Sequence, residues 1–127
     1  MHNLEAFLNS MFDKRTIILE HECGILILRK LEEGLKGEVH MSFFDHKLSA
    51  HTTLVKECLA WGFMEFDLQR IGTMIPSYAG AVRRFLEHRL GFKHEGTMRN
   101  FAWHKGQLVD VSFYSILREE VFNGGWL

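Results

Sequence analysis

The chain has 127 residues, in which 15 Lys and Arg oppose 16 Asp and Glu, for a formal net charge of −1. This length fits one domain spanning residues 1–127. The balanced charge argues against a protein that binds nucleic acid through a broadly basic surface. A local basic patch remains at Arg83, Arg84 and Arg89, whose simplest interpretation is the solvated face of a helix.

The two cysteines, Cys23 and Cys58, lie far apart in the sequence and belong to no Cys-x-x-Cys pair. The first residues lack the basic start of a secretory signal, and no apolar run approaches about 18 residues. We therefore expect reduced thiols, a cytoplasmic location and no membrane segment.

The first third of the chain predicts one helix followed by three strands. Apolar residues at helical spacing indicate an amphipathic helix over 3–13. Aliphatic and β-branched runs predict strands at Thr16–His21 and Ile25–Leu31, with a hairpin turn at Cys23-Gly24. A period of two then predicts a third strand, Glu38–Phe44, with one polar face.

Beyond residue 48 the chain alternates helices with strands. Leu54, Val55, Leu59 and Phe66 suit a helix that begins at Ser49 or Ala50. The remaining elements are a strand at 69–75 stopped by Pro76, a helix at 78–90 ended by Gly91, and strands at 92–104 and 108–117 joined by a turn at Lys105-Gly106. This order predicts an α/β or α+β domain with a mixed sheet and flanking helices.

Three segments in the second half carry a family resemblance: 70–76, ending in Ile-Pro; 90–99, reading Leu-Gly-Phe-Lys-His-Glu-Gly-Thr-Met-Arg; and 110–118, beginning Asp-Val-Ser-Phe-Tyr. In this order they resemble the C-terminal half of a GNAT N-acetyltransferase, most closely the branch of the ribosomal-protein alanine N-acetyltransferases. The resemblance covers roughly residues 37–120.

The resemblance implies a single-domain GNAT fold in which two neighbouring parallel strands splay apart and acetyl-CoA lies between them. Here those strands are the ones at 38–44 and 69–75. The backbone of the first, at Met41, Ser42 and Phe43, would pair with the pantetheine arm of acetyl-CoA.

The family binds the diphosphate with Gln/Arg-x-x-Gly-x-Gly/Ala at the start of a helix, whereas residues 45–53 contain no glycine. The remaining candidates for cofactor binding are His46, Lys47, Ser49, Ala50, His51, Thr52, Thr53 and, at the start of the second helix, Tyr78. In the alternative interpretation Ser49 caps the helix and Thr52 and Thr53 open it.

For catalysis, Glu38 and His40 lie on the polar face of the strand beside the gap, where either could accept the proton of an ammonium group. Alternatively, both point into solvent on an ordinary two-faced strand. The family often has a Tyr late in the second helix that acts as the general acid, but residues 85–88 contain no Tyr. Tyr114 matches a Tyr common in the resembling branch and is the candidate acid, or else a core residue.

Two functions stay open. The first is transfer of an acetyl group from acetyl-CoA to a primary amine of a peptide, protein or small molecule. The second is a GNAT-fold module that has lost acyl-CoA binding and serves in binding or regulation. The eight His residues form no metal-ligand pattern, so we expect no metal. The apolar tail at 121–127 either packs on its own domain or is covered by a second copy in a homodimer.

Overall fold

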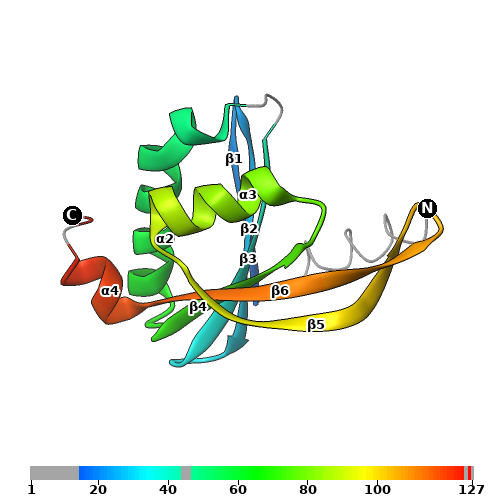
Figure 1. Cartoon of the computed structure of the whole chain (residues 1–127). Helices are drawn as coiled ribbons and strands as arrows, with labels where there is room; N and C mark the ends of the chain where they lie inside the picture. The colour runs from blue at the N-terminus through cyan, green and yellow to red at the C-terminus, as the bar shows by residue number, and fades with distance from the viewer. Residues whose placement is uncertain (1–14, 44–46, 125, 127) are drawn as a thin grey trace.

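A computed structural model of the chain describes residues 15–43, 47–124 and 126 (Figure 1). Its centre is a six-stranded mixed sheet with the strand order β1-β2-β3-β4-β6-β5. The predicted helix at 3–13 lies outside the described residues, as do Phe44 and His46.

Three antiparallel strands form the first half of the sheet: β1 (Thr16–His21), β2 (Gly24–Glu32) and β3 (Lys36–Phe43). They pair in sequence order, with Ile18 opposite Ile27 and Leu28 opposite Val39. The alternation of side chains turns Leu28 and Val39 into the core and leaves Glu38 and His40 on the other face. These three strand predictions are confirmed.

A helix covers this half of the sheet. It opens with the 3-10 turn η1 (Leu48–His51) and continues as α2 (Thr52–Glu65). Gly62 of α2 lies directly on β2, because a Cβ built at Gly62 would approach Leu28 Cδ2 to 2.3 Å. Glycine is therefore the residue that permits this close helix–sheet approach.

The second half of the chain forms strands β4 (Arg70–Pro76), β5 (Lys93–His104) and β6 (Gln107–Leu117). The β5–β6 hairpin extends well beyond the other strands (Figure 1). Its turn uses Lys105 and Gly106, whose φ angles of 51° and 77° match a two-residue type I′ turn. The predicted hairpin is confirmed.

The helix between β4 and β5 differs from the prediction in two ways. It begins at Gly80 rather than Tyr78, as α3 (Gly80–Arg84), and its second part is the π-helix η2 (Phe85–Leu90). It ends where predicted, since Gly91 adopts the left-handed conformation with φ 75°. Residues 78 and 79 stay outside the helix, in the turn closed by the bond from the Ala79 N–H to the Pro76 carbonyl.

A short last helix, α4 (Arg118–Phe122), has no counterpart among the predicted elements. Glu120 Oε1 accepts a hydrogen bond from the Leu117 N–H at 2.9 Å and so closes its first turn. Within the described part of the chain, no helix combines the length and apolar character needed to cross a membrane.

One hydrophobic core lies between the sheet and the helices. Its fully buried side chains include Phe63 and Leu59 of α2, Ile71 of β4 and Ile116 of β6. Trp126 packs against the same core, and Lys56 Nζ lies 5.3 Å from the centre of its ring. The tail therefore packs on its own domain at Trp126, the first of the two alternatives left by the sequence.

Candidate active site in the gap between two parallel strands

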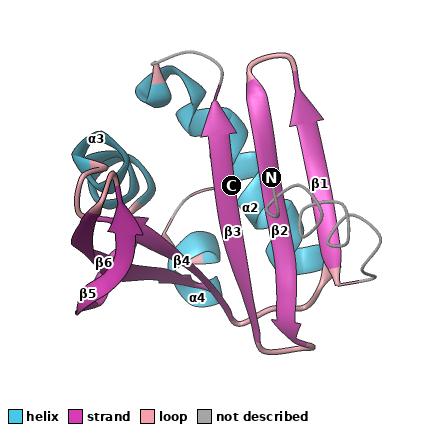
Figure 2. Cartoon of the chain, turned by 90° about the vertical axis from the view of Figure 1, so that its right-hand side faces the viewer, coloured by secondary structure: helices cyan, strands magenta, loops and turns pink. Residues whose placement is uncertain are grey.

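β3 and β4 are parallel neighbours that pair over only three residues. The register joins Lys36 to Arg70, Gly37 to Ile71 and Glu38 to Gly72, and it ends there. Figure 2 shows the two strands close at one end and diverging toward the other, with β4, β5 and β6 turned away from the first three strands. The predicted splay of the sheet is present.

Thr73 fixes the point where the strands part. Its Oγ1 donates a hydrogen bond of 2.8 Å to the carbonyl oxygen of Val39, one residue beyond the last backbone pair. Thr73 was not among the predicted site residues. The available signal was its position, because a polar residue lies between Ile71 and Ile75 on the apolar face of β4.

Beyond this apex the backbone of β3 faces an open edge. The Val39 carbonyl points toward β4, and successive residues of a strand turn their N–H and C=O groups to opposite sides. The backbone groups of Met41 and Phe43 therefore point to the same side as those of Val39, where β4 provides no paired residue. This is a strand edge of the kind that an extended ligand can pair with.

Glu38 and His40 lie together beside the apex. Glu38 Oε1 is 3.5 Å from His40 Nε2, and their side chains are 24% and 49% exposed. They occupy alternate positions of β3, so they share the face that points away from α2. The pair thus combines a half-buried carboxylate with an imidazole that reaches solvent.

A cavity of about 360 Å³ opens at the same point. Its lining includes Glu38 from β3, Gly72 and Thr73 from β4, and Tyr114 from β6. The register places Gly72 opposite Ser115 and Thr73 opposite Tyr114, so Glu38 and Tyr114 approach from opposite faces of the sheet. The cavity is therefore bordered by two of the three predicted catalytic residues, whose side chains lie on opposite faces of the sheet.

Tyr114 is almost fully buried, at 2% exposure, and its hydroxyl donates a hydrogen bond of 2.7 Å to Glu87 Oε1 of η2. Burial raises the pKa of the Tyr114 phenol, and the bond to the Glu87 carboxylate raises it further. Arg83 lowers the same pKa by its charge and a hydrogen bond, a smaller effect. Tyr114 is therefore held in its protonated form.

Glu87 was not predicted as a site residue. It belongs to the turn at 85–88, where the family resemblance implies a tyrosine that this chain lacks. The structure instead brings the Tyr114 hydroxyl to that turn from β6. Three further side chains on β5 and β6 are linked by hydrogen bonds. His94 Nε2 is 3.0 Å from Thr97 Oγ1, and Thr97 Oγ1 is 3.0 Å from Ser112 Oγ.

The residues predicted to bind the cofactor phosphates lie in and around η1. Ser49 is inside this 3-10 turn rather than at a helix cap, and no side chain caps either η1 or α2. The Thr52 hydroxyl donates to the Ser49 carbonyl at 2.8 Å. Lys47, Ala50 and Thr53 are exposed, and the His51 ring stacks on Phe43 at 4.7 Å between centroids.

Tyr78 lies elsewhere. It is 56% exposed, and its ring stacks on His104 of the β5–β6 hairpin with 3.8 Å between centroids. Tyr78 is not among the residues that line the cavity at the apex. A role for Tyr78 in cofactor binding stays a prediction.

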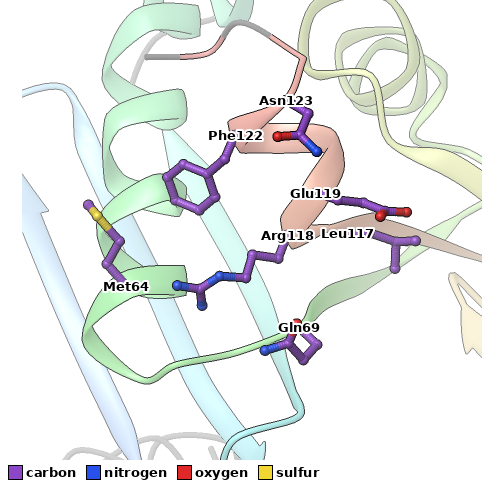
Figure 3. A pocket seen from close by; sticks show the side chains of 7 residues that line it. All are labelled: Met64, Gln69, Leu117, Arg118, Glu119, Phe122 and Asn123. Atoms are coloured by element: carbon purple, nitrogen blue, oxygen red, sulfur yellow. The ribbon is translucent and has the colours of Figure 1, made fainter.

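A second hollow, of about 660 Å³, lies between the end of α2, the start of β4 and α4 (Figure 3). At its centre Arg118 Nη1 donates to the carbonyl oxygens of Phe63 and Leu68, each at 3.0 Å. Arg118 thus ties the C-terminal end of α2 to α4. We assign this hollow a structural role and place the candidate active site at the apex of the gap.

Among residues 15–43 and 47–124, no three His, Cys, Asp or Glu side chains gather as a metal site requires.

No family model matches the chain. Two curated proteins are similar to about half of it. An uncharacterized N-acetyltransferase of Bacillus subtilis, YoaA, is 29% identical over 65 residues, which make up 51% of this chain and 36% of the relative. An uncharacterized N-acetyltransferase of Bacillus licheniformis, p20, is 31% identical over 67 residues, which make up 52% of this chain and 36% of the relative. The match therefore spans about a third of the length of these relatives.

Solved structures match nearly the whole chain. A variant of the spermidine N-acetyltransferase SpeG of Vibrio cholerae superposes with a TM-score of 0.78 at 18% identity, covering 97% of this chain and 78% of that one. A probable acetyltransferase superposes with a TM-score of 0.74 at 23% identity, covering 93% and 71%. The ribosomal-protein alanine branch is not singled out by these matches. The chain therefore has the GNAT fold, as the sequence predicts.

Proposed function

We propose that the chain is an acyl-CoA-dependent N-acetyltransferase that moves an acetyl group from acetyl-CoA to a primary amine of a peptide, protein or small molecule. The observation that carries this proposal is the parting of β3 and β4 after Glu38 and Gly72, which leaves a strand edge open toward a gap. Similarity over half the chain to two proteins named as N-acetyltransferases supports the same chemistry.

The open edge suits the pantetheine arm of acetyl-CoA, which carries amide groups. The backbone N–H and C=O groups of Met41 and Phe43 would hold that arm as a strand holds its neighbour. Bound acetyl-CoA would supply a thioester carbonyl. The ammonium group first loses one proton to become a neutral amine; a C–N bond then forms as the C–S bond breaks, the nitrogen loses a second proton, and the sulfur gains one.

Glu38 and His40 support the removal of the first proton, the one that the ammonium group loses before the attack. A primary amine is mostly protonated at neutral pH and must lose a proton before it can act as a nucleophile. The Glu38 carboxylate lines the cavity and attracts the ammonium group, and its neighbour His40 reaches solvent. The pair can therefore accept a proton inside the cavity and pass it outward.

Tyr114 supports the delivery of the proton that the sulfur gains. Its phenol is protonated across the neutral range, and its pKa is raised above the ordinary value, first by burial and then by Glu87. Tyr114 borders the cavity, and its hydroxyl lies on the face of the sheet opposite Glu38, so acceptor and donor of protons would act from two sides of the gap. Glu87 would act as a positioning residue that orients the phenol.

The acceptor is an amine whose positive charge suits Glu38. The matched Vibrio cholerae protein is named a spermidine N-acetyltransferase, so a polyamine is one small-molecule acceptor to test. A peptide with a free N-terminus is the other class. Exposure of the His40 side chain, at 49%, leaves room for the longer acceptor.

One observation favours the alternative, a non-catalytic GNAT-fold module. The stretch from Lys47 to Thr53 lacks the glycines that let backbone amides approach a diphosphate. A module that does not bind acyl-CoA would need no such glycines. The two functions differ in a single measurable property, which is affinity for acetyl-CoA.

Calorimetric titration of the chain with acetyl-CoA tests the proposal, with denaturation as a second readout. Ligand at 100 times its dissociation constant should stabilise the fold by about 2.7 kcal/mol. Thiol release is then followed with spermidine and with a short peptide as acceptors. Absence of both heat and stabilisation at millimolar acetyl-CoA would leave only the non-catalytic module.

A further inference from the structure

A hollow of about 300 Å³ lies where η1 meets α3 and η2. From η1 its lining includes Leu48 and Ser49, and from the other helix Arg84, His88 and Arg89. Figure 2 shows the start of η1 beyond the end of β3 and close to α3, on the side where the gap between β3 and β4 widens. The hollow therefore lies at the open end of the gap.

The π-helix η2 is what brings the two arginines to this hollow. In an α-helix, residues five apart point about 140° away from each other around the axis. A π turn closes its hydrogen bonds five residues apart, so it carries residue i+5 back over residue i. η2 spans Phe85–Leu90, so it begins directly after Arg84 and contains Arg89. The irregular turn thus aligns Arg84 and Arg89 on one face, with His88 beside them.

The helix divides its charged residues between two sides. Arg83 and Glu87 both act on Tyr114, which lies on the side of β6. Arg84, His88 and Arg89 are exposed and line the hollow on the side of η1. The basic patch noted in the sequence is therefore not one solvated face, because Arg83 belongs to the catalytic side and Arg84 and Arg89 to the hollow.

The charge of the hollow is one-sided, since none of its lining residues is acidic. The chain as a whole carries a net charge of −1, so three basic side chains around one hollow do not follow from its composition. Space for the Arg84 guanidinium comes from Gly80, where a Cβ would lie 3.2 Å from Arg84 Nη1. Guanidinium groups are the side chains best suited to phosphate oxygens.

We infer that Arg84, His88 and Arg89 form a phosphate-binding site that takes the diphosphate of acyl-CoA, in place of the glycine loop that this chain lacks. The inference rests on the proposed function. A cofactor paired with Met41 and Phe43 would leave the gap at its wide end, where the diphosphate follows the pantetheine arm and the basic hollow lies. Side chains of α3 and η2 then supply the contacts that the backbone amides of the glycine loop supply in the family.

The test compares three proteins: the unchanged chain, Arg84→Gln/Arg89→Gln, and the control Lys93→Gln/Lys105→Gln. The control removes the same charge from two exposed residues of the β5–β6 hairpin. Each protein is titrated with acetyl-CoA, with 3′-dephospho-acetyl-CoA and with inorganic pyrophosphate. Thermal denaturation checks that all three proteins fold.

We expect the arginine variant to bind acetyl-CoA and its dephospho form about 100-fold more weakly, about 10-fold for each lost charged contact. The control should stay within about 3-fold. Equal affinity of the arginine variant and the control would overturn the site and leave the acetyltransferase proposal intact. A loss confined to acetyl-CoA, absent with the dephospho form, would overturn the diphosphate assignment in favour of the 3′-phosphate.

Pyrophosphate separates failure of the site from failure of the proposed function. If the unchanged chain binds no acetyl-CoA, the acetyltransferase proposal fails. Pyrophosphate binding that disappears in Arg84→Gln/Arg89→Gln would still support the phosphate site, whereas no pyrophosphate binding by the unchanged chain would overturn the site as well.

Discussion

Thr73 and Val39 meet at the apex of the gap, where the Thr73 hydroxyl donates to the Val39 carbonyl at 2.8 Å. The backbone ladder between β3 and β4 has already ended at Glu38 and Gly72. A side chain therefore makes the last bond between the two halves of the sheet. Because the Thr73 side chain is short, this hydrogen bond limits how far β3 and β4 have separated at the point where the candidate active site begins.

Thr73→Val removes that bond and keeps the shape of the side chain. Thr73 is 7% exposed, so we expect the free energy of unfolding to fall by about 1 kcal/mol, the net contribution of one such hydrogen bond. Urea denaturation measures the change. Thr53→Val, at an exposed position of α2, is the matched control and should leave the stability unchanged. Equal stability of the two variants would show that the bond does not hold the apex.

Glu38→Gln tests the proton acceptor of the proposed reaction. The variant keeps the size of the side chain and its place in the cavity but has no carboxylate, so kcat should fall by about 10²-fold to 10⁴-fold. Affinity for acetyl-CoA should not change, because that ligand pairs with backbone in the proposal. Glu33→Gln, whose carboxylate is 85% exposed, is the control. Unchanged kcat in Glu38→Gln would exclude Glu38 as the base.

The strands could be predicted from sequence because each has a local signal. The alternation of Val39 and Met41 with His40 and Ser42 is visible without any partner strand, and Lys105-Gly106 is a short-range turn signal. The π turn at Phe85–Leu90 carries no such signal, since its apolar residues fit an α-helix equally well. Its effect on Arg84 and Arg89 appears only in three dimensions.

Of the candidate site, the proximity of Glu38 and His40 could be predicted from a local signal of the same kind. Glu38 and His40 share one strand, so their proximity follows from a period of two. Tyr114 and Glu87 are 27 residues apart in sequence, on a strand and a helix, and their hydrogen bond depends on how η2 crosses the sheet. Thr73 likewise acts across the sheet on Val39, over a separation of 34 residues. No local pattern specifies such pairs.

Tyr114→Phe gives a prediction for the pH dependence of stability. The pKa of Tyr114 is raised above its unfolded value of about 10, so the stability linked to its neutral phenol is present below pH 10 and lost as the pH rises through the raised pKa. At pH 8 the free energy of unfolding of the unchanged chain should be about 1 kcal/mol higher than that of Tyr114→Phe, because only the unchanged chain makes the bond to Glu87. That difference should begin to fall near pH 10 and disappear once the pH exceeds the raised pKa of Tyr114.

Urea denaturation of both proteins between pH 8 and about pH 11 measures this difference. A difference that stays constant across the range would contradict the raised pKa of Tyr114.

Gly62→Ala should destabilise the protein, although Ala favours helices over Gly by about 1 kcal/mol at exposed positions. The new Cβ would lie 2.3 Å from Leu28 Cδ2 inside a fully packed core, and such overpacking costs about 1–3 kcal/mol. The double variant Gly62→Ala/Leu28→Val removes the obstructing atom and should recover part of the loss. Additive effects of the two substitutions in denaturation would contradict a direct contact.

Arg118→Lys should destabilise the protein even though the charge is kept. Arg118 Nη1 bonds the carbonyl oxygens of Phe63 and Leu68, which lie at and just beyond the end of α2. A lysine ammonium is a point charge on a flexible stem and cannot reproduce the fixed planar geometry of the guanidinium, so we expect a loss of about 1 kcal/mol. Arg99→Lys, at an exposed position, should have no effect in the same urea titration.

The ion pair of Arg118 with Asp67 is separable from these carbonyl bonds. Asp67 is 81% exposed at the side chain, and its φ of 51° suits asparagine equally well. Asp67→Asn should therefore change the stability by less than about 0.5 kcal/mol. If Asp67→Asn instead matched the loss in Arg118→Lys, the ion pair and not the carbonyl bonds would join α4 to the end of α2.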